Sequence, residues 1–183
     1  MSKESADKEQ KRSFKREVFS WIACIVVTIL LTEFILNFVI INANIPSGSM
    51  ENTIMTNDKL IALRTSYWFN DPKRGDIIIF KYPDDETEWF IKRVIALPGE
   101  TVLVKDGKVY INGSKKALSE PYIKEEPVED FGPYKVPKNG YFVMGDNRNN
   151  SNDARDWETH YVSRDEILGK AWFRYYPSIK VIK

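Results

Sequence analysis

The chain has 183 residues, of which 43% are hydrophobic and 29% are charged, and its formal net charge is +1. This length predicts one globular domain, and the near-neutral charge gives no sign of a basic surface, so we expect no nucleic-acid partner. The single cysteine, Cys24, excludes an intrachain disulfide, and the single histidine, His160, argues against a histidine-based zinc site. We therefore expect no metal and no cofactor.

The N-terminal part of the chain predicts a membrane anchor. Residues 1–17 are polar and contain six basic residues, which favours a disordered tail. Residues 18–41 are apolar except for five side chains, and such a run is long enough to cross a hydrocarbon layer of roughly 30 Å. Because the basic residues precede the span, we expect a cytoplasmic tail over 1–17, a single-pass transmembrane helix over 18–41, and an extracytoplasmic domain over 42–183 in the cell membrane.

Two other interpretations of the apolar run remain open. A cleavable secretory signal would place small residues at one and three positions before the cut, and Ala43 fits the first position whereas Ile41 does not fit the second. A buried helix of a soluble domain would explain Glu33, although the run is longer than such a helix needs. Glu33 and Asn37 are one helical turn apart and share a face, which either meets a partner helix or lies near the outer membrane interface.

The rest of the chain has the short apolar runs of β-strands, so the predicted fold class is a mostly β domain after one N-terminal helix. Asp106-Gly107 between two such runs predicts a tight hairpin, and Ser163 with Glu166 has the spacing of a capping box at the start of a short helix. Residues 115–139 predict a surface excursion. The predicted strands are Leu60–Leu63, Asp76–Tyr82, Glu88–Leu97, Thr101–Val104, Lys108–Ile111, Tyr141–Met144 and Lys170–Tyr176.

Ser49 is the candidate nucleophile. It lies on a turn shaped by Pro46, which fixes one backbone angle, and by Gly48, which accepts angles that other residues resist. Such a turn can hold a hydroxyl outward beside a backbone N–H, as acyl transfer requires. The same residue types also form ordinary loops.

The candidate base is Lys92, within the strand-like run Trp89–Ile95. A free lysine with a pKa of about 10.4 is neutral in only about one molecule in 2,500 at pH 7, so a catalytic lysine must have its pKa lowered by burial. The alternative is that Lys92 points from the outer face of an edge strand. His160, alone in a polar stretch, is a weaker candidate.

Residues 144–155 form a third polar cluster, directly after a predicted strand. Asp153 and Arg155 are suited to a forked ion pair, and Ser151 can hydrogen-bond a neutral amine. Asn, Asp, Gly and Ser are also common turn formers, and the spacing does not match a calcium-binding loop.

Four blocks in this order resemble the sequence boxes of bacterial type I signal peptidases, which are serine endopeptidases with a Ser/Lys dyad. The preceding apolar span fits the same family, and the resemblance extends from Val18 to Tyr176. The blocks are Pro46-Ser47-Gly48-Ser49-Met50, Arg74–Phe80, Lys92–Glu100, and Gly145-Asp146-Asn147-Arg148 with Ser151, Asp153 and Arg155.

The resemblance implies a membrane-bound enzyme that removes signal peptides from secreted preproteins at Ala-X-Ala-type sites. Ser49 would attack the scissile carbonyl, Lys92 would act as general base, and the Ser47 hydroxyl would contribute to the oxyanion hole. Ser151, Asp153 and Arg155 would support the lysine and its loop. The residues implied to line the substrate pockets are Ile45, Met50, Ile54, Phe90 and Ile91.

The chain departs from this family pattern at four positions. Asn52 stands where proline is usual, Ala96 where glycine is usual, Asn149 where aspartate is usual and Ala154 where serine is usual. None of them removes a group assigned to proton transfer, so the departures bear on rate rather than on reaction type.

Two rival functions remain. A self-cleaving repressor-type peptidase also uses a Ser/Lys dyad on a β fold, but it is soluble and carries a DNA-binding domain for which this chain has no room. A membrane-tethered binding domain without catalysis would not need Ser49 or Lys92.

Overall fold

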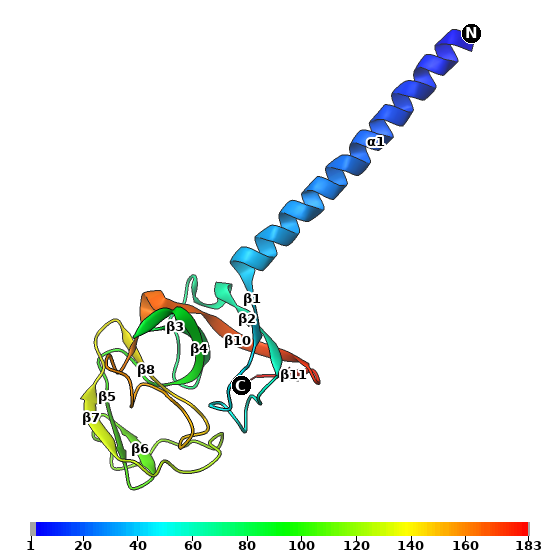
Figure 1. Cartoon of the computed structure of the whole chain (residues 1–183). Helices are drawn as coiled ribbons and strands as arrows, with labels where there is room; N and C mark the ends of the chain where they lie inside the picture. Colours follow the sequence, from blue (N-terminus) through cyan, green and yellow to red (C-terminus); the bar gives the residue numbers. More distant parts are fainter. Residues whose placement is uncertain (1–2, 183) are drawn as a thin grey trace. The chain divides into compact units, whose positions relative to one another are not determined.

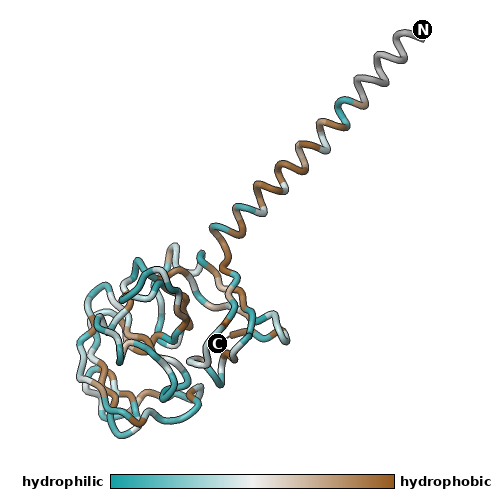
Figure 2. The backbone as a smooth tube through the Cα atoms, viewed as in Figure 1, coloured by the Kyte–Doolittle hydropathy of each residue, from teal (hydrophilic) through white to brown (hydrophobic). Residues whose placement is uncertain are grey.

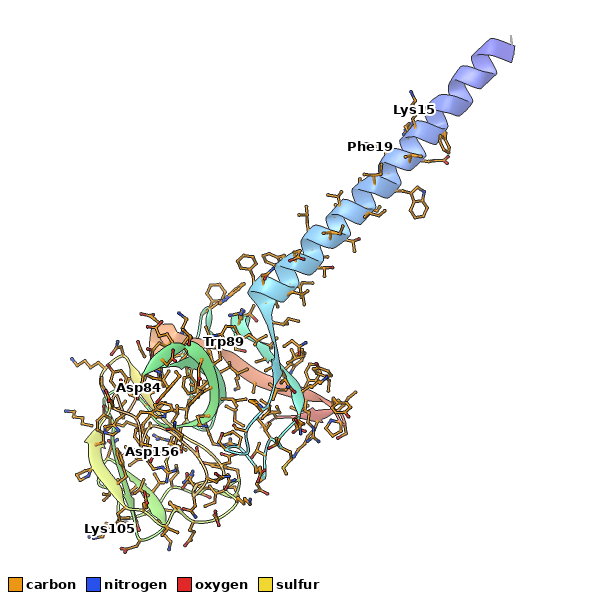
Figure 3. The ribbon with its side chains drawn as sticks, viewed as in Figure 1. Lys15, Phe19, Asp84, Trp89, Lys105 and Asp156 are labelled. Atoms are coloured by element: carbon orange, nitrogen blue, oxygen red, sulfur yellow. The ribbon has the colours of Figure 1, made fainter. Side chains whose placement is uncertain are left out.

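The computed structural model describes residues 3–182 and divides the chain into two compact units, Met1–Val39 and Ile40–Lys183. The first unit is helix α1 (Lys3–Phe34), which continues as a π-helical turn over Ile35–Val39. It is drawn as one long helix in Figure 1, and most of its second half is hydrophobic in Figure 2; Phe14–Val39 is long and apolar enough to cross a membrane. The side chains of Lys15 and Phe19 project from this helix (Figure 3).

Two details of the predicted anchor were wrong. Residues 3–17, expected to be disordered, are helical, because Lys, Glu, Gln, Ala and Arg are good helix formers that extend an apolar helix already nucleated beside them. Ile40 and Ile41, expected within the span, instead open strand β1 (Ile40–Asn44). Ile41 is only 3% exposed, because it packs in the core of the second unit.

Within the first unit, the polar groups of Glu33 and Asn37 bond to each other. Asn37 Nδ2 donates to Glu33 Oε2 at 3.0 Å and to the Glu33 carbonyl at 2.9 Å. This pairing reduces the cost of placing both side chains in an apolar medium. A partner helix on this face remains a prediction.

The second unit contains two antiparallel sheets (Figure 1), and the mostly β class is confirmed. The larger sheet has the strand order β1-β2-β10-β3-β4-β8-β9, with β11 paired to β10, and the smaller has the order β6-β5-β7. The larger sheet comprises β1 with β2 (Lys59–Leu63), β3 (Ile77–Tyr82), β4 (Asp85–Ala96), β8 (Gly140–Met144), β9 (Val162–Ser163), β10 (Ile167–Tyr176) and β11 (Lys180–Val181). The smaller comprises β5 (Thr101–Lys105), β6 (Lys108–Ile111) and β7 (Phe131–Lys135).

All seven predicted strands are present, and the sequence missed β1, β7, β9 and β11. Strand β7 lies inside the predicted excursion over 115–139, which is therefore only partly irregular. Gly132 and Pro133 have low strand propensity, so the local sequence does not predict this strand. Asp106 and Gly107 both have positive φ, 51° and 74°, and the tight hairpin between β5 and β6 is confirmed. The capping box of Ser163 and Glu166 is also formed, but it starts only the 3₁₀ turn Arg164–Glu166.

Strand β3 is buried on both faces and separates two core clusters. Ile78 and Phe80 pack in the larger cluster, with Val94 and Phe142, whereas Ile77 and Ile79 pack in the smaller one. Alternate side chains of a strand point to opposite faces, so a continuous apolar run is required here. Strand β4 pairs with β3 from Asp85 to Arg93, and the register places Lys92 opposite Ile78.

Candidate active site

Ser49 lies in the loop that connects β1 to β2. Ile45 closes the base of the loop, because its N–H donates to the Asp58 carbonyl at 3.0 Å and its carbonyl accepts from the Asn57 N–H at 2.7 Å. Within the loop, the Glu51 N–H donates to the Gly48 carbonyl at 3.1 Å. These bonds shape a compact turn, and Ser49 at its apex is only 6% exposed.

Lys92 reaches Ser49 from the middle of strand β4. Its Nζ lies 2.6 Å from Ser49 Oγ, and the residue is 4% exposed. The two residues are 43 positions apart in the sequence and meet because both β1 and β4 belong to the larger sheet. Lys92 does not point from an outer face, so that alternative is excluded.

The surroundings of Lys92 favour the neutral amine. The pKa of Lys92 is lowered to about 8, mainly because the amine is removed from water; the charges of Asp153 and Asp156 act against this shift and the nearby Arg155 adds to it. Nζ also lies 5.3 Å from the centre of the Phe90 ring. With a pKa of about 8, roughly one Lys92 in ten is neutral at pH 7. A general base with such a pKa operates near neutral pH.

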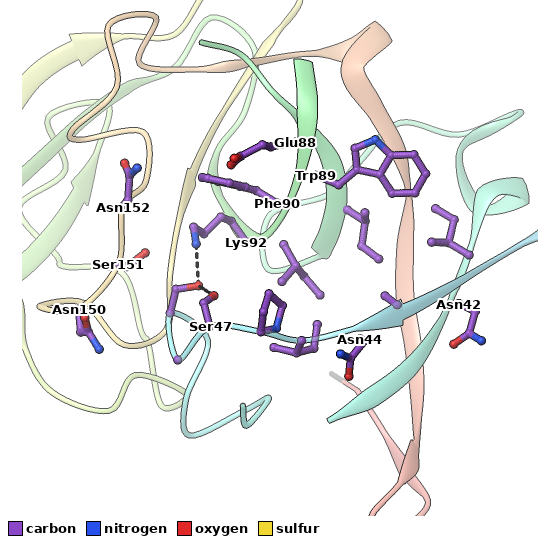
Figure 4. A pocket seen from close by; sticks show the side chains of 18 residues that line it. Asn42, Asn44, Ser47, Glu88, Trp89, Phe90, Lys92, Asn150, Ser151 and Asn152 are labelled. Carbon is purple, nitrogen blue, oxygen red and sulfur yellow. Dashed lines mark hydrogen bonds between the residues drawn. The ribbon is translucent and has the colours of Figure 1, made fainter. Parts of the chain in front are cut away.

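The Ser47 hydroxyl lies on the other side of the serine, 3.5 Å from Ser49 Oγ. The dashed lines of Figure 4 trace this chain of three polar groups, with Ser47 and Lys92 directed toward the same point. Ser47 thus holds a hydroxyl next to the Ser49 oxygen, within reach of the carbonyl oxygen of a substrate that Ser49 attacks, which is where an oxyanion develops in acyl transfer.

These groups open into a cavity of about 750 Å³ between β1 and β4. Ile45, Phe90 and Ile91 line it, as the sequence indicated. Met50 and Ile54, which were also expected to line the cavity, do not line it. They are 0% and 1% exposed and pack in the smaller core cluster, because burying an apolar side chain removes its surface from water and stabilises the fold. The lining residues that the sequence missed are Ile41, Asn42, Ala43, Asn44, Ile79, Glu88, Trp89, Asn150 and Asn152.

The polar cluster after β8 packs against the Ser49 turn and lines the cavity together with Lys92. Arg155 donates to both carboxylate oxygens of Asp153, at 2.8 and 3.0 Å, as expected for a forked pair, and Asp153 also accepts from the Gly145 N–H at 2.9 Å. Ser151 lines the cavity beside Lys92 (Figure 4), but its buried hydroxyl makes no hydrogen bond within residues 3–182. The expected bond from Ser151 to the amine is thus not formed in this state.

Gly145 permits this close packing. A Cβ atom on Gly145 would overlap the Ser151 hydroxyl and the Ser49 carbonyl oxygen, and it would lie 2.6 Å from the Ser151 Cβ. The backbone of the cluster therefore approaches the Ser49 turn at a distance that only glycine allows.

A buried ion pair behind the site was not assigned a role from the sequence. Arg93 donates to both oxygens of Asp146 at 2.8 and 2.7 Å, with side-chain exposures of 3% and 0%. Asn147, next to this pair, donates its N–H to the Ser49 carbonyl at 3.0 Å and its Nδ2 to the Gly48 carbonyl at 2.9 Å. The sequence did contain a signal for this pair. Arg93 follows Lys92 in an apolar strand, and a buried arginine requires a carboxylate partner.

His160 is occupied elsewhere. Its Nδ1 lies 2.9 Å from the Ala154 carbonyl oxygen, and its ring packs edge-on against Phe131 and Tyr134. It does not line the cavity. The structure therefore does not support His160 as the base.

The fold and the site define a β-rich serine peptidase. The sequence profile of the family described as Signal peptidase, peptidase S26 matches residues 18–176. Over 161 residues the chain is 44% identical to a probable signal peptidase I-2 of Synechocystis sp., covering 85% of this chain and 72% of that one. It is 35% identical to the signal peptidase I of Bacillus amyloliquefaciens, covering 96% and 97%.

Among solved structures, a signal peptidase I from Enterococcus faecalis is 35% identical and covers 55% of this chain and 97% of that chain, with a TM-score of 0.48. The chain belongs to the signal peptidase family, peptidase S26. It is a serine endopeptidase that removes signal peptides.

Proposed function

We propose that Ser49 and Lys92 are the catalytic dyad of this signal peptidase and that it cleaves secreted preproteins at Ala-X-Ala-type sites. The observation that carries the proposal is the 2.6 Å separation between Lys92 Nζ and Ser49 Oγ, in residues that are only 4% and 6% exposed. Neutral Lys92 accepts the Ser49 proton as Oγ attacks the scissile carbonyl. The Ser47 hydroxyl and the Ser49 N–H donate to the oxyanion, and such donors lower a barrier by roughly 3–4 kcal/mol each.

The intermediate then breaks its C–N bond, and protonated Lys92 gives its proton to the leaving amine, which is the new N-terminus of the mature protein. The signal peptide remains esterified to Ser49. Lys92, neutral again, takes a proton from water, whose oxygen attacks the ester. The signal peptide leaves with a new carboxylate, and the proton returns to Ser49. The ion pair of Asp153 and Arg155 holds the loop behind the amine during both steps.

The substrate lies as an extended strand between two free edges. Within residues 3–182, strand β1 pairs with β2 alone and β4 pairs with β8 from Arg93 onward, which leaves the first half of β4 open beside the cavity. Main-chain hydrogen bonds to such edges supply affinity that does not depend on sequence. Ile45, Phe90 and Ile91 provide the apolar surface for small side chains at one and three positions before the cut.

Location at the membrane follows from the chain order. The apolar helix ends ten residues before Ser49, so the reaction takes place near the membrane surface. The basic residues before the helix favour a cytoplasmic N-terminus and an extracytoplasmic domain over 42–183. Protease added outside intact spheroplasts should digest this domain, and digestion only after lysis would refute the orientation.

The test of the dyad is cleavage of a preprotein with an Ala-X-Ala site by the detergent-solubilised full chain. Ser49→Ala and Lys92→Met should be folded and inert, while the parent cuts after the second alanine. Lys170→Met is the matched control, because Lys170 also lies in the larger sheet but pairs with Asp76 at 2.6 Å. Activity in either dyad variant would refute the assignment, and an inert parent that still binds preprotein would favour the tethered binding domain.

A further inference from the structure

The segment Glu120–Val128 has no helix or strand and lies across the back of the active site. We call it the strap. It lies between β6 and β7, and within it only Pro127 is buried. An irregular segment with so little core of its own must be held by specific polar contacts. Its polar contacts include the two loops that carry the proposed catalytic residues.

One end of the strap is fixed to the nucleophile turn by Asn52. The Asn52 Nδ2 donates to the Tyr122 carbonyl at 2.9 Å and approaches the Ile123 carbonyl at 3.4 Å. Asn52 itself has a φ of 91°. Proline, the residue usual at this position in the sequence pattern, fixes φ near −65° and has no side-chain donor, so it allows neither feature.

The other end of the strap is fixed to the loop after β8 by Asn149. The Asn149 Nδ2 donates to the Glu126 carbonyl at 3.0 Å, and its Oδ1 accepts the Val128 N–H at 2.9 Å. Aspartate, the usual residue here, has no donor for the Glu126 carbonyl. Two of the four departures from the family pattern are thus carboxamides that bind the same segment.

The strap also contacts the buried ion pairs behind the site, through its first residue Glu120 and through Tyr122 and Lys124. The Arg93 guanidinium lies 3.9 Å from the centre of the Tyr122 ring, and the Lys124 N–H donates to the Asp146 carbonyl at 3.0 Å. Glu120 accepts two bonds from the fully buried Arg148, at 3.0 and 2.6 Å. The strap therefore contacts the Ser49 turn, strand β4 and the loop after β8.

We propose that Asn52 and Asn149 are positioning residues that, through the strap, hold the Ser49 turn and the loop behind Lys92 in one fixed relation. This inference rests on the proposed dyad. Proton transfer requires the short separation between Ser49 and Lys92, and a displacement of about 1 Å can lower a rate by roughly a hundredfold. None of the strap residues lines the cavity in which the proposed substrate strand lies, so the loss falls on kcat and not on KM.

The test uses Asn52→Asp and Asn149→Asp in the detergent-solubilised full chain. Each change keeps the shape and the tolerance of positive φ but removes the donor and places a carboxylate against a carbonyl oxygen. Each variant should lower kcat about tenfold and leave KM within about twofold of the parent value. This loss is smaller than the roughly hundredfold loss expected for a full 1 Å displacement. The double variant should lose less than the product of the two single losses, because both asparagines act through the same segment and their effects are not independent.

The control for simple destabilisation is Val109→Ala, which truncates a fully buried side chain of the smaller sheet away from the site. It should lower Tm at least as much as the asparagine variants and leave kcat unchanged. Parent-like kcat in both single variants, multiplicative losses in the double variant, or an equal loss of kcat in Val109→Ala would each overturn the inference. If Ser49→Ala remained active, the dyad itself would fail; if it is inert and the asparagine variants are normal, only the strap inference fails.

Discussion

Replacing Lys92 by methionine should make the protein more stable at neutral pH while abolishing its activity. The pKa of Lys92 is about 8 in the folded protein, against 10.5 for a free side chain. A difference of about 2.5 units corresponds to about 3 kcal/mol of stability lost when the buried group must carry its charge. Methionine fills a similar volume without a charge, at the cost of the hydrogen bond to Ser49, worth about 1 kcal/mol. The net expected gain at pH 7 is about 2 kcal/mol.

The sign of the pH dependence follows from proton counting. Between about pH 8 and pH 10.5 the unfolded chain binds more protons at Lys92 than the folded chain does, so the parent becomes more stable as pH rises through this window. Below about pH 8 the buried Lys92 is charged, and the full stability cost of burying that charge is present. The advantage of the methionine variant should therefore be largest at pH 7 and should disappear by about pH 10.

The assay is denaturant unfolding of the two detergent-solubilised full chains, followed by tryptophan fluorescence at pH 7 and at pH 10. The difference between the chains removes the contributions of all other titrating groups. A difference that is equal at both pH values, or a variant that is less stable at pH 7, would refute the reasoning that burial depresses this pKa.

Three further predictions concern the groups around the dyad. Ser47→Ala should lower kcat by about 10²–10³ with little change in KM, as measured by steady-state cleavage, since it removes one oxyanion donor. Gly145→Ala should inactivate the enzyme, because the methyl group overlaps the Ser151 hydroxyl; a parent-like rate would show that the loop can retreat. Arg93→Lys should destabilise the fold by roughly 3 kcal/mol in a denaturant titration, because an ammonium cannot keep both bonds to the buried Asp146. An unchanged midpoint would refute the last prediction.

Local chemistry was sufficient for much of the fold. The Asp106-Gly107 hairpin, the apolar helix and the seven predicted strands were readable because each depends on neighbouring residues: positive φ at a turn, length of an apolar run, or alternation along a strand. Strand β7 was not readable, because Gly132 and Pro133 weaken the local signal and pairing with β5 supplies what the sequence lacks.

The amino-acid sequence by itself determined which side chains are available for the chemistry: a serine on a Pro/Gly turn, a lysine in an apolar strand, and a polar loop after another strand. Only the tertiary structure decided how they are used. Sheet pairing brings Ser49 and Lys92 together across 43 positions and removes the amine from water, which no local pattern specifies. Tertiary packing also places the Met50 side chain in the core, and it brings Asn52 within hydrogen-bonding distance of the strap. Burial and long-range contacts are properties of the packed chain, and the pKa of a catalytic lysine depends on both.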